Sequence, residues 1–260
     1  MNRFEQFLSK NTVKGSGALP LVHTSPAFHL RKFAEQNVIL TSECDVFKGE
    51  DLSYFFVGRP AYKYSSDVSE SSYWEFPCCF VFEFDVLPDP KRVFPFDSGA
   101  FDKKLYPSYI KMMEIKEFEV SSVSDAPSKI IGTFFGNTSD YFKMIPKSKK
   151  DFIQEYSLSV MDMEIQALHR LSLEAGSKTF DDRRLTIEVQ SNSSVDLVKS
   201  NPIAVIAPSE YFEDNEFLNH VLNVWKSEPI SYPIFSLNIN SCFSQIYERV
   251  FNFYKMRKYL

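Results

Sequence analysis

Three stretches of this 260-residue chain hold side chains that can bind and act on a small ligand. The first is Leu21–Ser25, in which an apolar strand pattern leads into His23, Thr24 and Ser25. An imidazole can contact sugar hydroxyls without a full charge at neutral pH. Ser25 followed by Pro26 predicts a helix N-terminus, where free backbone N–H groups favour a phosphate. A lone histidine after a strand is also common as a capping or core residue.

The second stretch is Asp51–Tyr64, which combines an aromatic strand with a guanidinium and two phenols. Tyr54–Val57 predicts a short buried strand, and the Gly-Arg-Pro sequence that follows ends it. Arg59 can bind a phosphate through two hydrogen bonds, while Tyr62 and Tyr64 can stack on a flat ring. These residue types suit a pocket for a ring with an attached phosphate. An aromatic strand that leaves a core through an ordinary turn would show the same pattern.

The third stretch is Asp181–Gln190, where Glu188 lies between the apolar residues Ile187 and Val189 of a predicted strand. A fixed carboxylate beside a carbon that gains positive charge lowers a reaction barrier through preorganised electrostatics. An alternating strand often turns such a residue to solvent instead. No one of the three stretches is specific when taken alone.

The elements that must position these residues follow from hydrophobic periodicity and turn signals. The pattern mixes helices and strands along the chain, with no internal repeat and no linker, and therefore predicts a single α+β domain over residues 1–260. The expected helices are Arg3–Lys10, Ser25–Gln36, Leu105–Glu117, Asp151–Glu174, Asp214–Lys226 and Ser241–Tyr259. The expected strands are Leu19–His23, Val38–Leu40, Tyr54–Val57, Phe76–Val86, Ile130-Ile131 with Thr133–Phe135, Arg184–Gln190, Pro202–Ala207 and Ile230–Phe235.

Composition narrows the class of protein. Hydrophobic residues make up 44% of the chain, enough for a sizeable core. The net charge of −5 gives no global basic field, so a nucleic-acid partner would need a local basic groove. The four cysteines form no Cys-x-x-Cys pair and no histidine lies at zinc-finger spacing, which indicates reduced thiols and no metal site. We find no signal-peptide pattern and no apolar run of about 18 residues, and we expect a cytoplasmic protein without a membrane span.

The order of the three stretches is more informative than any one of them. Histidine on an early strand, then an aromatic segment with tyrosine, then glutamate on a late strand resembles the His–Tyr–Glu arrangement of ADP-ribosyltransferases. The chain is most similar to the DarT-like branch of bacterial toxins and phage-defence enzymes. The similarity covers Leu19–Tyr64 and Arg184–Trp225, whereas an insertion around residues 86–174 has no counterpart.

The resemblance implies a split β-sheet core with surrounding helices, and NAD as a substrate held in a cleft between two sheets, with no metal. It implies that Glu188 holds the nicotinamide ribose and stabilises positive charge. The same resemblance assigns His23 to a ribose and Arg59 to the phosphates. Tyr62, or else Tyr54, would stack on nicotinamide. A second basic catalytic residue is open between Arg31, Lys48 and Arg59. Loss of nicotinamide gives the ribose oxocarbenium character, as in glycoside hydrolysis.

Partners follow less directly. An acceptor nucleic acid is slightly favoured over protein, because basic residues cluster at Lys147–Lys150, Arg183-Arg184 and Lys255–Lys258. A toxin would also have a neutralising antitoxin partner.

Two other classes of protein stay open. Asp182, Glu188 and Gln190 loosely resemble the acidic motif of restriction-enzyme-like, metal-dependent nucleases, with glutamine where lysine is usual. The chain could also be a non-catalytic interaction protein.

Overall fold

Strands from distant parts of the chain form one mixed sheet in the computed structural model, which describes residues 1–10, 19–62, 71–87, 89–174 and 185–260. The strand order is β10-β9-β5-β1-β4-β7-β6, with β3 added beside β4. Helices surround this sheet, so the predicted α+β class is confirmed. The strands are β1 Leu21–Pro26, β3 Ser42–Glu43, β4 Asp51–Val57, β5 Pro77–Phe82, β6 Arg92–Phe94, β7 Glu188–Ser191, β9 Ala204–Pro208 and β10 Glu228–Tyr232, while β2 Val38–Ile39 and β8 Val195–Asp196 pair separately.

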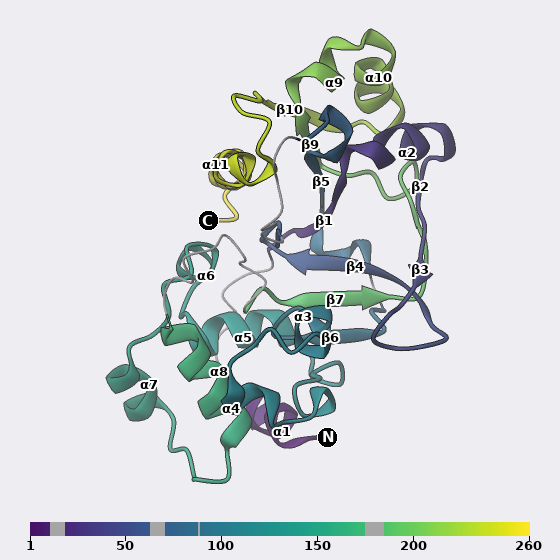
Figure 1. Ribbon diagram of the computed structural model, residues 1–260. Helices are drawn as coiled ribbons and strands as arrows, with labels where there is room; N and C mark the ends of the chain where they lie inside the picture. Colours follow the sequence, from purple (N-terminus) through teal and green to yellow (C-terminus); the bar gives the residue numbers. More distant parts are fainter. Residues whose placement is uncertain (11–18, 63–70, 88, 175–184) are drawn as a thin grey trace.

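The sheet diverges between β1 and β4. These two strands pair only through Leu21 with Val57 and Val22 with Phe56. By contrast, β1 pairs with β5 over its whole length, and β4 pairs with β7 over four residues. Figure 1 shows the result, with β1 and β5 running along a different direction from β4 and β7. The sheet therefore has two halves that part from one another beyond Val22.

Each half has its own helices (Figure 1). Around the β4–β7–β6 half lie α1 Arg3–Lys10, α3 Ser98–Asp102, α4 Ser108–Lys111, α5 Ala126–Phe134, α6 Thr138–Phe142, α7 Lys149–Glu155 and α8 Met163–Leu173. Near the β1–β5–β9 half lie α2 Leu30–Gln36, α9 Ser209–Glu213, α10 Asn215–Asn219 and α11 Phe243–Met256. Short turns of 3-10 or π helix are η1 Ala27–His29, η2 Tyr73–Glu75, η3 Phe84–Val86, η4 Ile115–Glu117, η5 His220–Val224 and η6 Ile239–Cys242.

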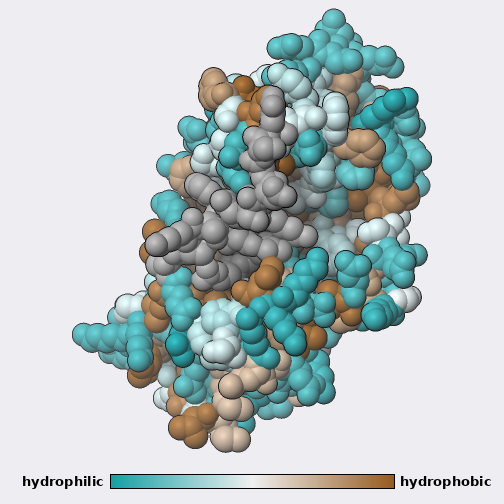
Figure 2. Space-filling model, viewed as in Figure 1, coloured by the Kyte–Doolittle hydropathy of each residue, from teal (hydrophilic) through white to brown (hydrophobic). Residues whose placement is uncertain are grey.

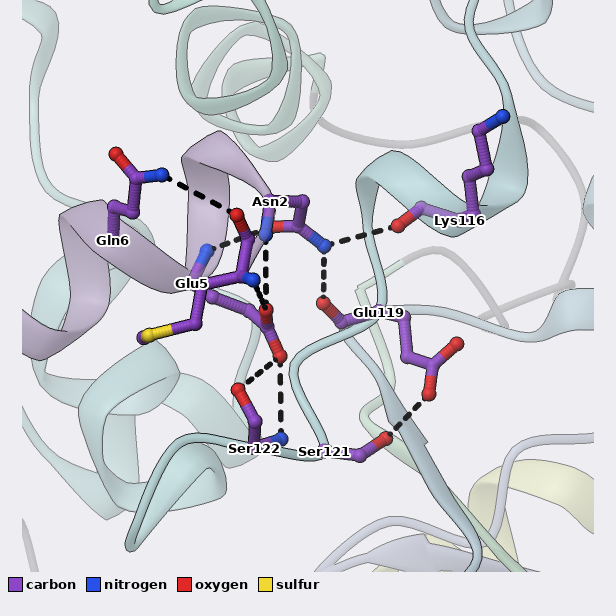
Figure 3. Close-up of polar contacts among 8 residues, drawn as sticks. Asn2, Glu5, Gln6, Lys116, Glu119, Ser121 and Ser122 are labelled. Atoms are coloured by element: carbon purple, nitrogen blue, oxygen red, sulfur yellow. Dashed lines mark hydrogen bonds and ion pairs between the residues drawn. The ribbon is translucent and has the colours of Figure 1, made fainter.

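The helical segment over residues 89–174 is connected to the N-terminus by a polar network that Figure 3 shows. The buried carboxylate of Glu5 accepts hydrogen bonds from the backbone and hydroxyl of Ser122. The side-chain amide of Asn2 donates to the carbonyls of Lys116 and Glu119. A buried carboxylate needs such donors, so α1 and this segment stabilise each other. Figure 2 shows hydrophobic side chains among hydrophilic ones at the lower end of the molecule. Between α7 and α8, Val160 and Met161 are exposed.

The predicted helix start at Ser25 is wrong. β1 continues through Ser25 and Pro26, which pair with Cys78 and Pro77 of β5. Neither η1 nor α2 has a capping side chain at its start. Continued pairing with β5 therefore outweighs the local Ser-Pro signal, and Ser25 offers a strand-end hydroxyl rather than a helix N-terminus for a phosphate. The predicted end at Gln36 is confirmed, with Asn37 in the left-handed conformation that closes helices.

The unmatched middle of the chain differs most from expectation. The residues predicted as strands, Ile130-Ile131 and Thr133–Phe135, lie in α5 and at its C-cap, Phe135. This helix is buried on nearly all sides and so lacks a polar face. The single helix predicted over Asp151–Glu174 is two helices, α7 and α8. The Asp162 carboxylate accepts a hydrogen bond from the Ser159 backbone at 2.6 Å and forms a turn between them. The helix predicted over Leu105–Glu117 is likewise two short turns, α4 and η4.

The remaining strand predictions are confirmed with shifted ends, as the bounds of β2, β4, β5, β7, β9 and β10 show. Asp214 caps α10 as expected, because its carboxylate accepts from the backbone of Glu216 and Phe217. The helix predicted after it divides into α10 and the π-helical turn η5. The predicted C-terminal helix is α11.

Candidate functional site

A pocket of about 550 Å³ opens where β1 and β4 diverge, within the size range of small-molecule sites. It brings together five of the residues that sequence analysis proposed. The five are Thr24, Ser25, Tyr54, Tyr62 and Glu188. His23 and Arg59 do not line it.

Sheet register explains why these residues meet. Residues paired across strands point to the same face of a sheet. Phe56 pairs with Val22 of β1 on one side and with Glu188 of β7 on the other, so all three share one face. Thr24 lies two residues after Val22 and Tyr54 two residues before Phe56, so both share that face and extend in the same direction from the antiparallel pair. Because β1 and β4 part beyond Val22, the space between Thr24 and Tyr54 is open.

Glu188 lies at the buried edge of this pocket, with 1% of its surface exposed. One carboxylate oxygen accepts hydrogen bonds from the Ser98 hydroxyl and the Gln190 amide, each at 2.7 Å. The other oxygen accepts from the Ser98 backbone N–H at 3.1 Å. Three donors on two residues hold the group in one orientation. The solvent-facing orientation common for glutamate in alternating strands does not occur here.

A second carboxylate shares the pocket. Asp97 is buried, lines the same space, and caps α3 by accepting from the Ala100 backbone at 2.6 Å. Burial and the nearby Asp97 charge raise the pKa of Glu188 to about 7, against the hydrogen bonds from Ser98 and Gln190. Among the described residues, no ion pair neutralises either carboxylate. This environment favours a ligand with positive charge.

The orientation of Gln190 is fixed by a further chain of contacts. Its amide nitrogen faces Glu188 and Ser98, while its amide oxygen lies 3.4 Å from the guanidinium of Arg92. Arg92 in turn binds both carboxylate oxygens of Glu50, at 2.7 and 2.8 Å, and stacks 4.0 Å over the ring of Phe47. A guanidinium can only donate, so it keeps the oxygen of Gln190 on its side and the donor NH₂ toward Glu188.

Tyr54 presents a fixed aromatic ring to the pocket. Its hydroxyl lies 2.7 Å from the thiol sulfur of Cys44. Burial raises the pKa of Tyr54, and the charges of Glu188 and Asp97 add to the rise, so the phenol is neutral. The ring therefore lines the same pocket as the two carboxylates and is held at its hydroxyl end.

His23 bridges the divergence from the opposite face. Its register partner on β5 is Phe80, and its ring packs against Phe33 and Phe55. The Nδ1 atom lies 2.9 Å from the carbonyl oxygen of Tyr54. Burial lowers the pKa of His23, so the ring is neutral at pH 7. The imidazole therefore joins β1 to β4 just where their ladder stops.

Tyr62 and Arg59 are held by aromatic packing. Tyr62 lines the pocket but stacks on Phe243 with ring centroids 4.7 Å apart, so one ring face is covered. Arg59 is buried and donates to the carbonyl of Phe142. Its guanidinium lies 5.0 Å from the ring centroid of Tyr247. The contacts of Arg59 connect the end of β4 to α6 and α11, and Arg59 itself does not line the pocket.

Sequence reasoning missed Asp97, Ser98 and Lys103, which line the pocket from α3 and its end. The sequence Asp97-Ser98-Gly99, shortly after Pro95, is a helix-cap signal, but nothing in the sequence pairs it with Glu188. Tyr64, Asp182 and Arg183-Arg184 lie outside the described residues, so the nuclease hypothesis and the basic-groove hypothesis stay predictions. Arg31 forms an exposed ion pair with Glu35, and Lys48 is exposed; neither lines the pocket.

Comparison of the chain with protein-family models, with curated proteins and with solved structures finds no match. Within the described ranges, no helix has the length and apolar character needed to cross a bilayer. The same ranges hold no group of three or more His, Cys, Asp or Glu residues arranged for a metal ion. Inferences about function therefore rest on the pocket and on the resemblance.

Proposed function

We propose that the chain is an NAD-dependent ADP-ribosyltransferase, which breaks the bond between nicotinamide and ribose and transfers the remaining ADP-ribose to an acceptor. The observation that carries the proposal is the position of Glu188. Its carboxylate lines a pocket at the divergence of two half-sheets, in a fixed orientation and on the same sheet face as Tyr54. The resemblance in sequence implies the same combination of a split sheet, a tyrosine and a glutamate around NAD.

The chemistry suits the charges in the pocket. The bond from C1′ of the ribose to the pyridinium nitrogen breaks, and its electron pair leaves with neutral nicotinamide. Positive charge then develops on the ribose, where a fixed carboxylate is most stabilising. Glu188 supplies that carboxylate and Asp97 adds negative charge nearby. The acceptor atom bonds to C1′ and releases its proton to solvent.

Other residues have roles that fit their contacts. The ring of Tyr54 gives nicotinamide a stacking surface beside the carboxylates, and it does so better than Tyr62, whose ring face is covered by Phe243. The hydroxyl of Thr24 lies on the pocket face of β1, and Ser25 lines the pocket from the end of the same strand; both suit contacts with ribose or phosphate oxygens. Lys103 is the cation of the described lining, and we assign it to the diphosphate in place of Arg59.

Action as a toxin or anti-phage effector follows from the resemblance alone and is part of the same proposal. So is a neutralising partner protein. Neither is needed for the NAD chemistry, which the purified chain can display without any partner.

The experiment is to incubate the purified chain with NAD and to follow free nicotinamide by chromatography. We expect release in buffer that contains a metal chelator, because the proposed mechanism uses only side chains of the protein. Calorimetric titration of NAD should show binding under the same conditions. Absence of both binding and release would reject the proposal. Cleavage of nucleic acid that stops on chelation would favour the nuclease alternative instead.

A further inference from the structure

Three exposed aromatic side chains belong to two neighbouring turns beside the pocket. Phe28, Tyr73 and Trp74 have 66%, 49% and 56% of their surfaces exposed. Their two turns, η1 and η2, contact each other and are joined by a hydrogen bond from the Ala27 backbone to the Phe76 carbonyl. We call these three residues the aromatic platform. Exposed aromatic residues grouped in this way are typical of binding surfaces.

The platform adjoins the pocket through its own neighbours in sequence. Pro26 lies just before η1, and Glu75 is the last residue of η2; both line the pocket. Pro77, which starts β5, lines it as well. A ligand that rests on the platform can therefore extend into the pocket.

The charged lining of the pocket is mostly acidic. Against Lys103 there are six carboxylates, at Glu43, Asp45, Glu75, Asp97, Asp102 and Glu188. Glu43 is the last residue of β3 and Asp45 lies two residues later; both are exposed. In the described parts of the chain neither of them has an ion-pair partner. A nucleic-acid backbone would be repelled by this lining, whereas a cationic segment would be attracted.

We infer that the acceptor is a basic segment of a protein, docked on the aromatic platform. Its Arg or Lys side chains would lie over the rings of Phe28, Tyr73 and Trp74 through cation–π contacts and would pair with Glu43 and Asp45. The inference names the acceptor class of the proposed transferase and so rests on that function. In the transfer, C1′ loses its bond to nicotinamide and gains one to a nucleophilic atom of the segment, whose proton goes to solvent.

The test measures binding first, so that it does not depend on turnover. A fluorescent peptide of alternating Arg, Ser and Lys is titrated with the full chain, beside single-stranded RNA and DNA of equal charge magnitude. We expect the peptide to bind more tightly than either oligonucleotide, and the binding to weaken as salt rises. The double variant Phe28→Ser/Trp74→Ser should lower peptide affinity by roughly tenfold or more, as expected for two lost cation–π contacts.

Matched controls separate the platform and its acids from general surface effects. Glu43→Lys/Asp45→Lys should also weaken the peptide roughly tenfold or more. Asp85→Lys/Asp89→Lys makes the same change in net charge beyond the opposite end of β5 and should weaken it much less. Met112→Ser removes an exposed apolar side chain of the insertion and should have no effect. The inference would be overturned if the platform and Glu43/Asp45 double variants bound the peptide as tightly as the control variants do. Tighter binding of RNA or DNA than of the peptide would also overturn it.

Labelled NAD then distinguishes this inference from the proposed function. With the basic peptide present, we expect label on the peptide and not on the oligonucleotides. Nicotinamide release without peptide binding would leave the transferase standing and reject this acceptor. Peptide binding without nicotinamide release would reject the transferase and leave a binding surface for basic proteins.

Discussion

The Nδ1 atom of His23 lies 2.9 Å from the carbonyl oxygen of Tyr54, across the point where β1 and β4 stop pairing. A carbonyl only accepts hydrogen bonds, so Nδ1 carries the proton and Nε2 is the free acceptor in the neutral ring. One contact thus ties the strand that carries Thr24 and Ser25 to the strand whose tyrosine faces the pocket. The rings of Phe33 and Phe55 pack against this imidazole and support its contact between the two half-sheets.

The ring of Tyr54 should matter more than its hydroxyl. Tyr54→Ala removes the proposed stacking surface and should weaken NAD binding by about 1 kcal/mol or more, as expected for a lost aromatic contact. Tyr54→Phe loses only the contact with the Cys44 thiol and should bind NAD nearly as tightly as the parent chain. Calorimetry on both variants is the measurement. Equal losses in the two would show that the ring does not contact the ligand.

The pH dependence of turnover should reflect Glu188. Its pKa is raised to about 7, and the ionised form stabilises positive charge, so kcat/KM should rise with pH through about 7. Asp97→Asn keeps the oxygen that caps α3 but removes the charge that raises the pKa of Glu188. The pKa of Glu188 should then fall, and the rise of kcat/KM with pH should move to lower pH. A profile identical to that of the parent chain would mean that Asp97 does not influence the titrating group.

The same pKa fixes the sign of a stability effect. Glu188 is a stronger base in the folded chain than in the unfolded chain, with a pKa of about 7 against 4.5. Its contribution to the free energy of unfolding is therefore complete below about pH 4.5 and is lost as pH rises through 7. Glu188→Gln cannot ionise, so denaturant titrations of this variant should lack that part of the pH dependence. An unchanged pH dependence would contradict the raised pKa.

Gln190 should act as a positioning residue for Glu188. Gln190→Met keeps the volume but removes the donor to the carboxylate and the acceptor for Arg92. We expect kcat to fall while KM for NAD changes little, because the carboxylate loses its fixed orientation. Losing a donor to the charged form should also move the rise in the pH profile to higher pH. A melting-temperature loss with an unmoved pH profile would indicate a purely structural role.

Arg59 should contribute to stability. Arg59→Met removes the donor to the Phe142 carbonyl and the stacking on Tyr247, which together should lower the free energy of unfolding by about 2–4 kcal/mol. The resemblance instead implies a phosphate contact, which predicts weaker NAD binding. Denaturant titration and calorimetry of the variant decide between these outcomes. Near-normal stability with weak NAD binding would return Arg59 to the phosphates.

The sequence predicts those structural features whose signals lie within a short stretch of the chain. The apolar runs of β4 and β9 and the Asp214 cap are local, and they were predictable. Glu188 could be placed on a strand, yet its burial follows from β7 lying between β4 and β6, which is a long-range pairing. Ser98 meets Glu188 over a separation of 90 residues, with no local pattern to show it. Ser25-Pro26 failed for the same reason, because pairing with β5 overrides a helix-start signal.

The helical segment over residues 89–174 shows a second limit of prediction from sequence. In α5, buried residues surround the helix, and an apolar run of that length cannot be told from a strand by periodicity alone. Between α7 and α8, a single turn closed by Asp162 breaks a pattern that continues at helical spacing on both sides. Both errors come from tertiary burial and side-chain capping, which outweigh local propensity.

The most direct test of the central claim is the rate of nicotinamide release from NAD by the parent chain and by Glu188→Gln. Gln preserves the size of the side chain and can keep its contacts with Ser98, but it carries no charge. We predict that the parent chain releases nicotinamide and that the variant does so roughly two to three orders of magnitude more slowly. For each protein, the amount of nicotinamide formed should equal the amount of NAD consumed. Release at near-parent rates by the folded variant would contradict the role of Glu188 and, with it, the proposed mechanism.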